Sequence, residues 1–141
     1  MQLLLKEESY DVIGACFEVY KDKGPGFVEQ IYHECLEFEF RLRGTPAVSK
    51  PKLQIAYKGH LLDRRPEPDF VCHRAIILEI KAVKKLTVEH RAQLHNYLRA
   101  TGKEVGLLVN FCSHPKLEWE RIVVTKREPI SPELTDDIRL Q

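Results

Sequence analysis

The chain has 141 residues, 43% hydrophobic and 30% charged, which is the composition and length of one globular domain spanning residues 1–141. Its formal net charge of +1 neither indicates nor excludes a nucleic-acid partner, because the placement of charges matters more than their sum. No apolar run approaches the ~20 residues that cross a membrane, so we expect a cytoplasmic protein without a membrane partner.

Two helices are predicted in the first third of the chain. Residues 5–20 place Ile13, Phe17 and Tyr20 at helical spacing, which indicates an amphipathic helix. The stretch "KDKGPG" then breaks the chain, and a second helix is expected to end near Gly44. The apolar stripe expected on this second helix consists of Val28, Ile31, Cys35, Phe38 and Leu42.

The middle of the chain is predicted to form strands. Leu53, Ile55 and Tyr57 alternate with less apolar residues, and "KGH" provides a turn, so a hairpin is expected. Two further strand segments, residues 69–72 and 75–83, flank the short stretch "CHR".

The last third alternates helix and strand signals. A third helix is expected over Val88–Ala100 after a Thr87 cap, followed by a central strand "VGLLVNF" over residues 105–111. Another strand is expected over residues 119–125 and a short helix after Ser131. Helices on both sides of a run of strands indicate an α/β fold with a mixed central β-sheet flanked by α-helices.

The strand at residues 75–81 carries two charges that a buried strand does not favour. Glu79 and Lys81 lie two positions apart and therefore share one face. One explanation is a structural ion pair at the end of the strand, because an unpaired buried carboxylate costs several kcal/mol. The other is a divalent-cation site, in which Asp69, Glu79 and the Ile80 backbone carbonyl supply oxygen ligands suited to Mg²⁺.

Three motifs carry a resemblance to a known family. Pro68–Asp69 followed by "EIK" at residues 79–81 resembles the D…ExK signature of the PD-(D/E)xK nuclease superfamily. The stretch "GFVEQIY" at residues 26–32 matches the pattern of the GxxExxY protein family, a branch of that superfamily. The stretches "QLHNYL" (93–98) and "GLLVNF" (106–111) resemble the family's glutamine-bearing helix and the strand after it.

The resemblance implies a restriction-endonuclease-like core and a metal-dependent nuclease. Such an enzyme hydrolyses phosphodiester bonds of nucleic acid, here expected to be DNA, through a metal-activated water. Mg²⁺ is the implied cofactor, with Mn²⁺ able to substitute, and the implied metal ligands are Asp69, Glu79, the Ile80 carbonyl and Glu29, the last often through water. The implied catalytic residues are Glu29, Asp69, Glu79, Lys81 and Gln93.

Several alternatives stay open at this point. The chain could instead be a non-catalytic module of the same fold that binds nucleic acid or protein, and either version could require a homodimer or a partner protein. None of the six histidines and four cysteines is assigned to catalysis. The charged loop residues Arg64, Arg65, Lys84 and Lys85 are candidate phosphate contacts. The aromatic residues expected in the core are Phe27, Phe38, Phe40 and Trp119.

Overall fold

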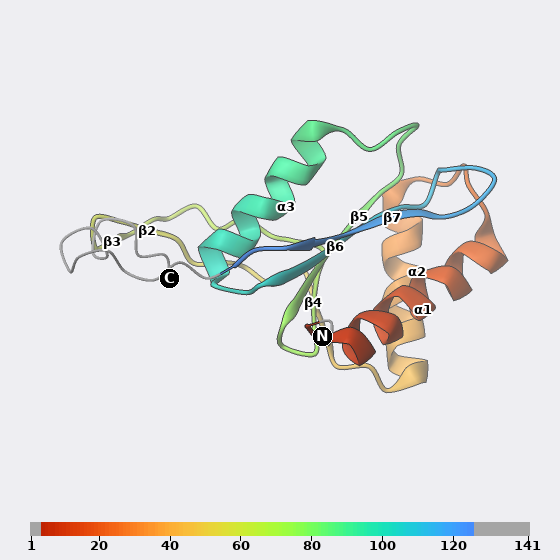
Figure 1. Ribbon diagram of the computed structural model, residues 1–141, viewed down its shortest axis with the longest axis horizontal. Coiled ribbons are helices and arrows are strands. Elements are labelled where there is room, and N and C mark those ends of the chain that lie inside the picture. The colour runs from red at the N-terminus through yellow and green to blue at the C-terminus, as the bar shows by residue number, and fades with distance from the viewer. Residues whose placement is uncertain (1–3, 126–141) are drawn as a thin grey trace.

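The computed structural model describes residues 4–125. Two helices come first along this part of the chain, followed by five strands, a third helix and two more strands (Figure 1). The helices are α1 (Lys6–Lys23), α2 (Glu29–Arg43) and α3 (Val88–Thr101). The strands are β1 (Ala47–Ser49), β2 (Ala56–Tyr57), β3 (His60–Leu61), β4 (Phe70–Cys72), β5 (Ile76–Lys81), β6 (Val105–Asn110) and β7 (Glu118–Val123).

The central sheet is mixed, as the sequence predicts. Its five strands follow the order β1-β4-β5-β6-β7, and β5 and β6 run parallel while the other neighbours run antiparallel. Helix α3 makes the connection between the two parallel strands, which cannot be joined by a tight turn. Strands β2 and β3 form the predicted hairpin as a separate two-stranded sheet, shorter than expected.

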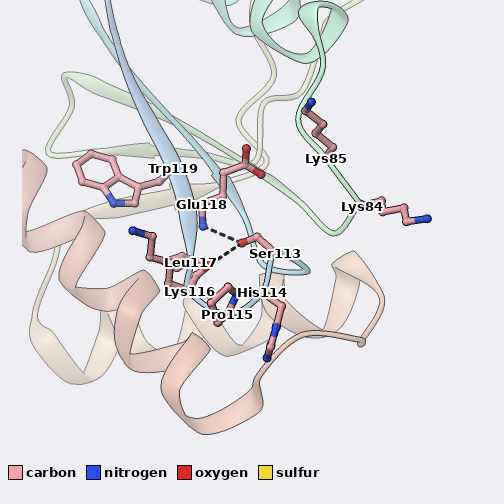
Figure 2. A pocket seen from close by; sticks show the side chains of 9 residues that line it. All are labelled: Lys84, Lys85, Ser113, His114, Pro115, Lys116, Leu117, Glu118 and Trp119. Carbon is pink, nitrogen blue, oxygen red and sulfur yellow. Dashed lines mark hydrogen bonds between the residues drawn. The ribbon is translucent and has the colours of Figure 1, made fainter.

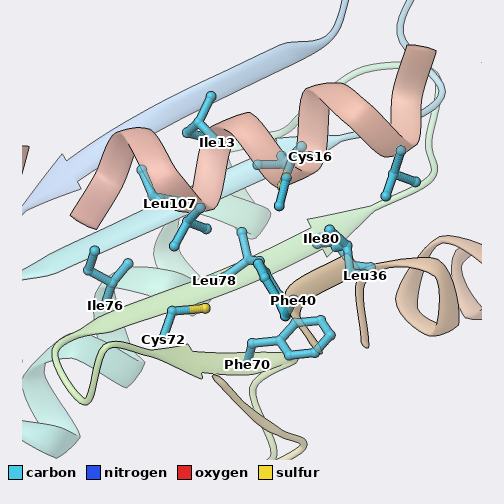
Figure 3. Close-up of a cluster of buried hydrophobic side chains, with 14 of the residues drawn as sticks. Ile13, Cys16, Leu36, Phe40, Phe70, Cys72, Ile76, Leu78, Ile80 and Leu107 are labelled. Atoms are coloured by element: carbon cyan, nitrogen blue, oxygen red, sulfur yellow. The ribbon is translucent and has the colours of Figure 1, made fainter. Parts of the chain in front are cut away.

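Helices cover both faces of the central sheet. Helices α1 and α2 lie on one face and α3 on the other (Figure 1). Ile76, Leu78 and Ile80 of β5 point into the core beneath α1 and α2 (Figure 3), whereas Ile77 packs with residues of α3. Because side chains alternate along a strand, Glu79 and Lys81 also lie on the α3 face.

The buried face of α2 differs from the predicted one. Ile31, Phe38 and Leu42 are 41%, 57% and 66% exposed, and the helix instead buries a stripe one position further along the chain. The buried residues of α2 are Tyr32, His33, Leu36 and Phe40. The sequence of α2 carries apolar residues on two faces, so its periodicity alone does not select the one that packs on the sheet. Tyr32, on the buried face that was not predicted, stacks on Phe111 with ring centroids 4.6 Å apart.

The expectation for the four core aromatics is correct only for Phe40. Phe40 is 2% exposed and packs edge-on against Phe70, whereas Phe27, Phe38 and Trp119 are 47%, 57% and 37% exposed. Trp119 lies on β7, which forms one edge of the sheet, and Phe27 lies in the loop before α2. Edge strands and loops leave large side chains partly in water even where the local sequence is apolar.

The remaining predictions on elements can be checked directly. Helix α3 begins after Thr87, whose side chain accepts a hydrogen bond from the backbone N–H of His90, so the predicted cap is confirmed. The short helix predicted after Ser131 lies outside the described residues. Among residues 4–125, each helix is too short or too polar to cross a membrane.

An acid on α1 ties the helical layer to the turn between β4 and β5. Asp11 accepts hydrogen bonds from the Thr45 hydroxyl (2.8 Å) and Arg43 Nε (3.3 Å), and lies 2.8 Å from His73 Nε2. Burial raises the pKa of the Asp11 carboxyl, but these hydrogen bonds together outweigh burial and leave the pKa below its ordinary value of 3.8. A carboxyl with a lowered folded-state pKa adds stability above its unfolded-state pKa, and loses it as the pH falls through the folded-state pKa.

We therefore expect Asp11→Asn to lower the free energy of unfolding at neutral pH by about 1–3 kcal/mol. The difference from the unmodified protein should shrink as the pH falls below 3.8, and urea unfolding at several pH values measures it. Asp22→Asn is the matched control, because the Asp22 side chain on the same helix is 74% exposed. A deficit independent of pH would show that the Asp11 charge is not responsible.

Candidate active site

The predicted site residues meet where β5 ends. Phe70 pairs with Leu78 in the antiparallel β4–β5 ladder, so the next pair outward sets Asp69 opposite Glu79. Glu29 is the first residue of α2, and Gln93 lies in the second turn of α3. Asp69 and Glu79 are separated along the chain because the chain turns back between β4 and β5. That turn brings the two residues opposite each other at the end of the β4–β5 ladder.

The two carboxylates are fixed by the backbone of the opposite strand. The Asp69 N–H donates to Glu79 Oε1 at 2.7 Å, and the Ile80 N–H donates to Asp69 Oδ2 at 2.8 Å. The N–H and C=O of one strand residue point to the same side, so the Ile80 carbonyl also faces Asp69. The structure therefore brings the Asp69 carboxylate, the Glu79 carboxylate and the Ile80 carbonyl to one place.

Lys81 is held by an amide more closely than by a carboxylate. Its Nζ donates to Gln93 Oε1 at 3.2 Å, while Glu79 Oε2 lies 3.9 Å away. The predicted ion pair between Glu79 and Lys81 is therefore present but long. The contact with Gln93 joins β5 to α3 and keeps the ammonium beside the two carboxylates.

The electrostatics of this cluster favour an added cation. Burial, and then the charge of Asp69, raises the pKa of Glu79 to about 8, although the Asp69 N–H and Lys81 oppose the shift. Burial and the charge of Asp69 also raise the pKa of Glu29, against the charges of Lys81 and His33. Carboxylate and carbonyl oxygens that are buried together without enough positive charge form a donor set that fits Mg²⁺ or Mn²⁺.

The position of Glu29 bears on how such an ion would be held. Within residues 4–125, no three His, Cys, Asp or Glu side chains are grouped closely enough to hold a metal ion by themselves. Asp69, Glu79 and the Ile80 carbonyl therefore stay the predicted direct ligands, with water expected in the other positions, as is usual for Mg²⁺. A role for Glu29 stays a prediction, and it would act through one of these waters.

His33 contacts the site although none of the histidines was assigned to it. Its Nδ1 lies 3.4 Å from Asp69 Oδ1, and its Nε2 lies 2.8 Å from Ser49 Oγ. The ring is buried and stacks on Phe70 with centroids 4.3 Å apart. The sequence holds one signal for this contact, because His33 is four residues after Glu29 and so shares its helical face.

The two nitrogens of His33 can be tested separately. An Asn side chain places its amide N–H near the position of Nδ1, and a Gln side chain places it near Nε2. We expect His33→Ala to weaken Mn²⁺ binding about 10-fold or more, as loss of a group that orients a ligand does, and His33→Asn to retain more affinity than His33→Gln. Calorimetric titration measures this, and equal affinities of Asn and Gln variants would contradict a role through Asp69.

The motif residues Gly26 and Tyr32 shape the loop that leads into α2. The Tyr32 hydroxyl donates to the Gly24 carbonyl at 2.5 Å and accepts from the Phe27 N–H at 3.1 Å. Gly26 has φ of 115°, a conformation that favours glycine. These residues therefore set the position of Glu29 without forming part of the charged cluster.

Asn110 is a second residue that the sequence reasoning missed. Its side chain is fully buried and takes part in four hydrogen bonds. The Oδ1 atom accepts from the N–H groups of Val83 and Cys112, and Nδ2 donates to the Val83 carbonyl and to Glu118 Oε1. The segment that follows Lys81 is thereby tied to β6 and β7. The signal was a single amide within the apolar stretch "VGLLVNF".

Comparison with known proteins identifies a matching family model and a similar fold. A family model described as PD-(D/E)XK nuclease superfamily matches residues 6–122. No curated protein sequence matches the chain. The crystal structure of SSO0001 is similar, with a TM-score of 0.53 and 20% sequence identity over 77% of this chain. The chain spans 55% of the length of that protein, and a likeness at this identity shows a shared fold.

Proposed function

The chain belongs to the PD-(D/E)XK nuclease superfamily, and from this membership we propose that it is a metal-dependent nuclease acting on phosphodiester bonds. We take its substrate to be DNA, its place of action to be the cytoplasm, and residues 1–141 to form one domain of the GxxExxY branch. The observation that carries the proposal is the pair of backbone hydrogen bonds that fix the two carboxylates, from the Asp69 N–H to Glu79 and from the Ile80 N–H to Asp69, with Lys81 nearby.

Three groups of the chain would hold the metal ion. These are the carboxylates of Asp69 and Glu79 and the carbonyl of Ile80, with Glu29 acting through water. When bound, Mg²⁺ or Mn²⁺ lowers the pKa of its water and draws negative charge from a phosphate oxygen. The backbone N–H groups that bind one oxygen of each carboxylate keep both ligands in place before the ion arrives.

Lys81 supplies the second positive charge. An ammonium has three N–H donors, and one of them is directed to Gln93 Oε1. The other two remain for a water or a phosphate oxygen at the reacting centre. Lys81 would then orient the attacking water and offset the charge that builds up on the phosphate in the transition state. Gln93 is the residue that holds this ammonium in position.

Cleavage assays test the proposal. Labelled single- and double-stranded DNA and RNA are incubated with the protein and Mg²⁺, Mn²⁺ or a chelator. We expect metal-dependent cleavage that falls at least about 100-fold in Asp69→Asn, which removes a ligand. Asp63→Asn is the matched control, because Asp63 is an exposed acid in the loop before β4. Full activity of Asp69→Asn would exclude the proposed site.

The presence of a contact between Lys81 and Glu79 fits a second candidate function. In that case the two side chains form a structural ion pair, and the protein is a module of the same fold that binds nucleic acid or protein without cleaving it. Calorimetric titration with Mn²⁺ separates the two functions. Absence of Mn²⁺ binding, even with nucleic acid present, would support the binding module.

A further inference from the structure

A cavity lies beside the end of the strand that carries Glu79 and Lys81. It has a volume of about 760 Å³ and is formed by two segments, the one that follows β5 and the turn between β6 and β7 (Figure 2). The first segment contributes Lys84 and Lys85, and the second contributes residues 113–119. This volume is in the range of sites that hold small ligands or single nucleotides.

The chemistry of the lining is basic. Lys84, Lys85 and Lys116 bring three ammonium groups, and all three residues are exposed. Figure 2 shows the side chains of Lys84 and Lys85 extending away from the chain at one side of the cavity. The one acid in the lining, Glu118, already accepts a hydrogen bond from the buried Asn110 amide. The charge of the cavity therefore suits an anionic partner.

Trp119 adds an aromatic surface to these charges. Its side chain is 37% exposed on the edge strand β7, where no further strand of the described residues covers it. Figure 2 shows Trp119 on one side of the cavity lining and Lys84 and Lys85 on the other, so a strand that crosses the cavity would place phosphates on the cations and a base on the ring, the combination by which proteins bind unpaired nucleic acid. Bases inside a duplex are already stacked on one another, so only an unpaired base can use such a ring.

The cavity is connected to the candidate active site through the backbone. Lys84 follows Lys81 by three residues, and Asn110 binds both backbone groups of the intervening Val83. The same amide contacts Cys112 and Glu118 at the two ends of the β6–β7 turn. One buried side chain thus fixes both walls of the cavity relative to the end of β5.

We propose that this cavity binds a single-stranded segment of nucleic acid, with Lys84, Lys85 and Lys116 contacting phosphates and Trp119 stacking on one base. The inference rests on the proposed nuclease function for the class of partner. It adds that the substrate presents unpaired nucleotides to the cavity at the end of β5 and the β6–β7 turn.

Trp119 provides the test, because it is the one tryptophan of the chain. Its fluorescence is recorded while a 12-nucleotide single strand, or the blunt duplex of the same sequence, is added in a chelator. We expect saturable quenching by the single strand, weakened by salt, and little quenching by the duplex. Binding is measured without metal, so this result does not depend on cleavage.

Substitutions locate the binding surface. We expect Lys84→Gln/Lys85→Gln to weaken single-strand binding at least about 5-fold through the loss of two phosphate contacts. Lys52→Gln/Lys58→Gln is the matched control, because both lysines are exposed and lie in or near the β2–β3 hairpin, far from the cavity (Figures 1 and 2). With a labelled strand, Trp119→Ala should bind about 5- to 100-fold more weakly, and Trp119→Phe should retain most affinity.

Two results would overturn the inference. One is equal quenching by duplex and single strand, and the other is a loss of affinity no larger in the cavity variants than in the control. Circular dichroism during heating confirms that each variant is folded. Cleavage without single-strand quenching would remove this inference alone, whereas quenching without cleavage of any substrate would remove the nuclease proposal and leave the binding site.

Discussion

Glu79→Gln is expected to abolish cleavage while the metal-free protein becomes more stable. Glutamine keeps an oxygen that can accept from the Asp69 N–H, so the link between the strands survives. Above the unfolded-state pKa of Glu79, the folded protein must either bury this charge beside Asp69 or bind a proton, a cost that the raised pKa reflects and that glutamine removes. The gain in the free energy of unfolding should be about 1–3 kcal/mol, the range for desolvation of a buried polar group.

Two measurements on one preparation check this expectation. Thermal unfolding in a chelator gives the stability, and cleavage with Mg²⁺ gives the activity, which should fall at least about 100-fold. Glu18→Gln removes an exposed acid of α1 and should change neither quantity. A Glu79→Gln protein that is less stable than the unmodified one would indicate that Glu79 serves the fold, as the binding-module alternative requires.

Asn110→Ala is expected to destabilise the protein by about 2–4 kcal/mol, because several buried hydrogen bonds are lost together. The variant leaves the N–H and carbonyl of Val83 without their partner. Since Val83 follows Lys81 closely, we also expect reduced cleavage under conditions where the variant is fully folded.

Urea unfolding measures the loss of stability, and cleavage is compared well below the unfolding midpoint of the variant. Asn96→Ala is the matched control, since Asn96 is an exposed amide on α3 and its loss should change stability by less than about 0.5 kcal/mol. A normal cleavage rate in a folded Asn110→Ala protein would show that the hydrogen bonds of Asn110 stabilise the fold without positioning the site.

The order of elements and the mixed sheet could be predicted from the sequence because the local patterns agree with the global fold. In β5, the alternation of Ile76, Leu78 and Ile80 with Glu79 and Lys81 identifies both the strand and its two faces. The Thr87 cap likewise locates the start of α3. In both cases the signal depends on residues that are close together in the chain.

The orientation of α2 could not be predicted in this way. Residues of both candidate stripes are apolar, and what buries Tyr32 and Phe40 is the fit of their rings to Phe111 and Phe70. Those partners lie far away in the sequence. A periodic pattern carries no information on such contacts. It therefore predicts that the more continuous apolar stripe of α2 is buried, although that stripe faces water.

The candidate site shows the same division. The motif spacing identifies Asp69, Glu79 and Lys81, and the structure brings them together with Gln93. The motif spacing could not identify His33 or Asn110, because their roles depend on contacts with Asp69 and Val83 across the fold. A single polar residue in an apolar stretch is informative only after its partners are known.

The central place of β5 in the sheet also determines how the site can be lost. Strand β5 has neighbours on both sides, and residues 76–80 are buried. Backbone amides in such a strand exchange with solvent mainly when the whole domain opens, whereas exposed loops open locally. The Glu79 carboxylate should therefore stay in place until global unfolding, and heat should remove activity and fold together. Any modulation of activity in the native protein would have to act on the surrounding loops, such as the segment of Lys84 and Lys85.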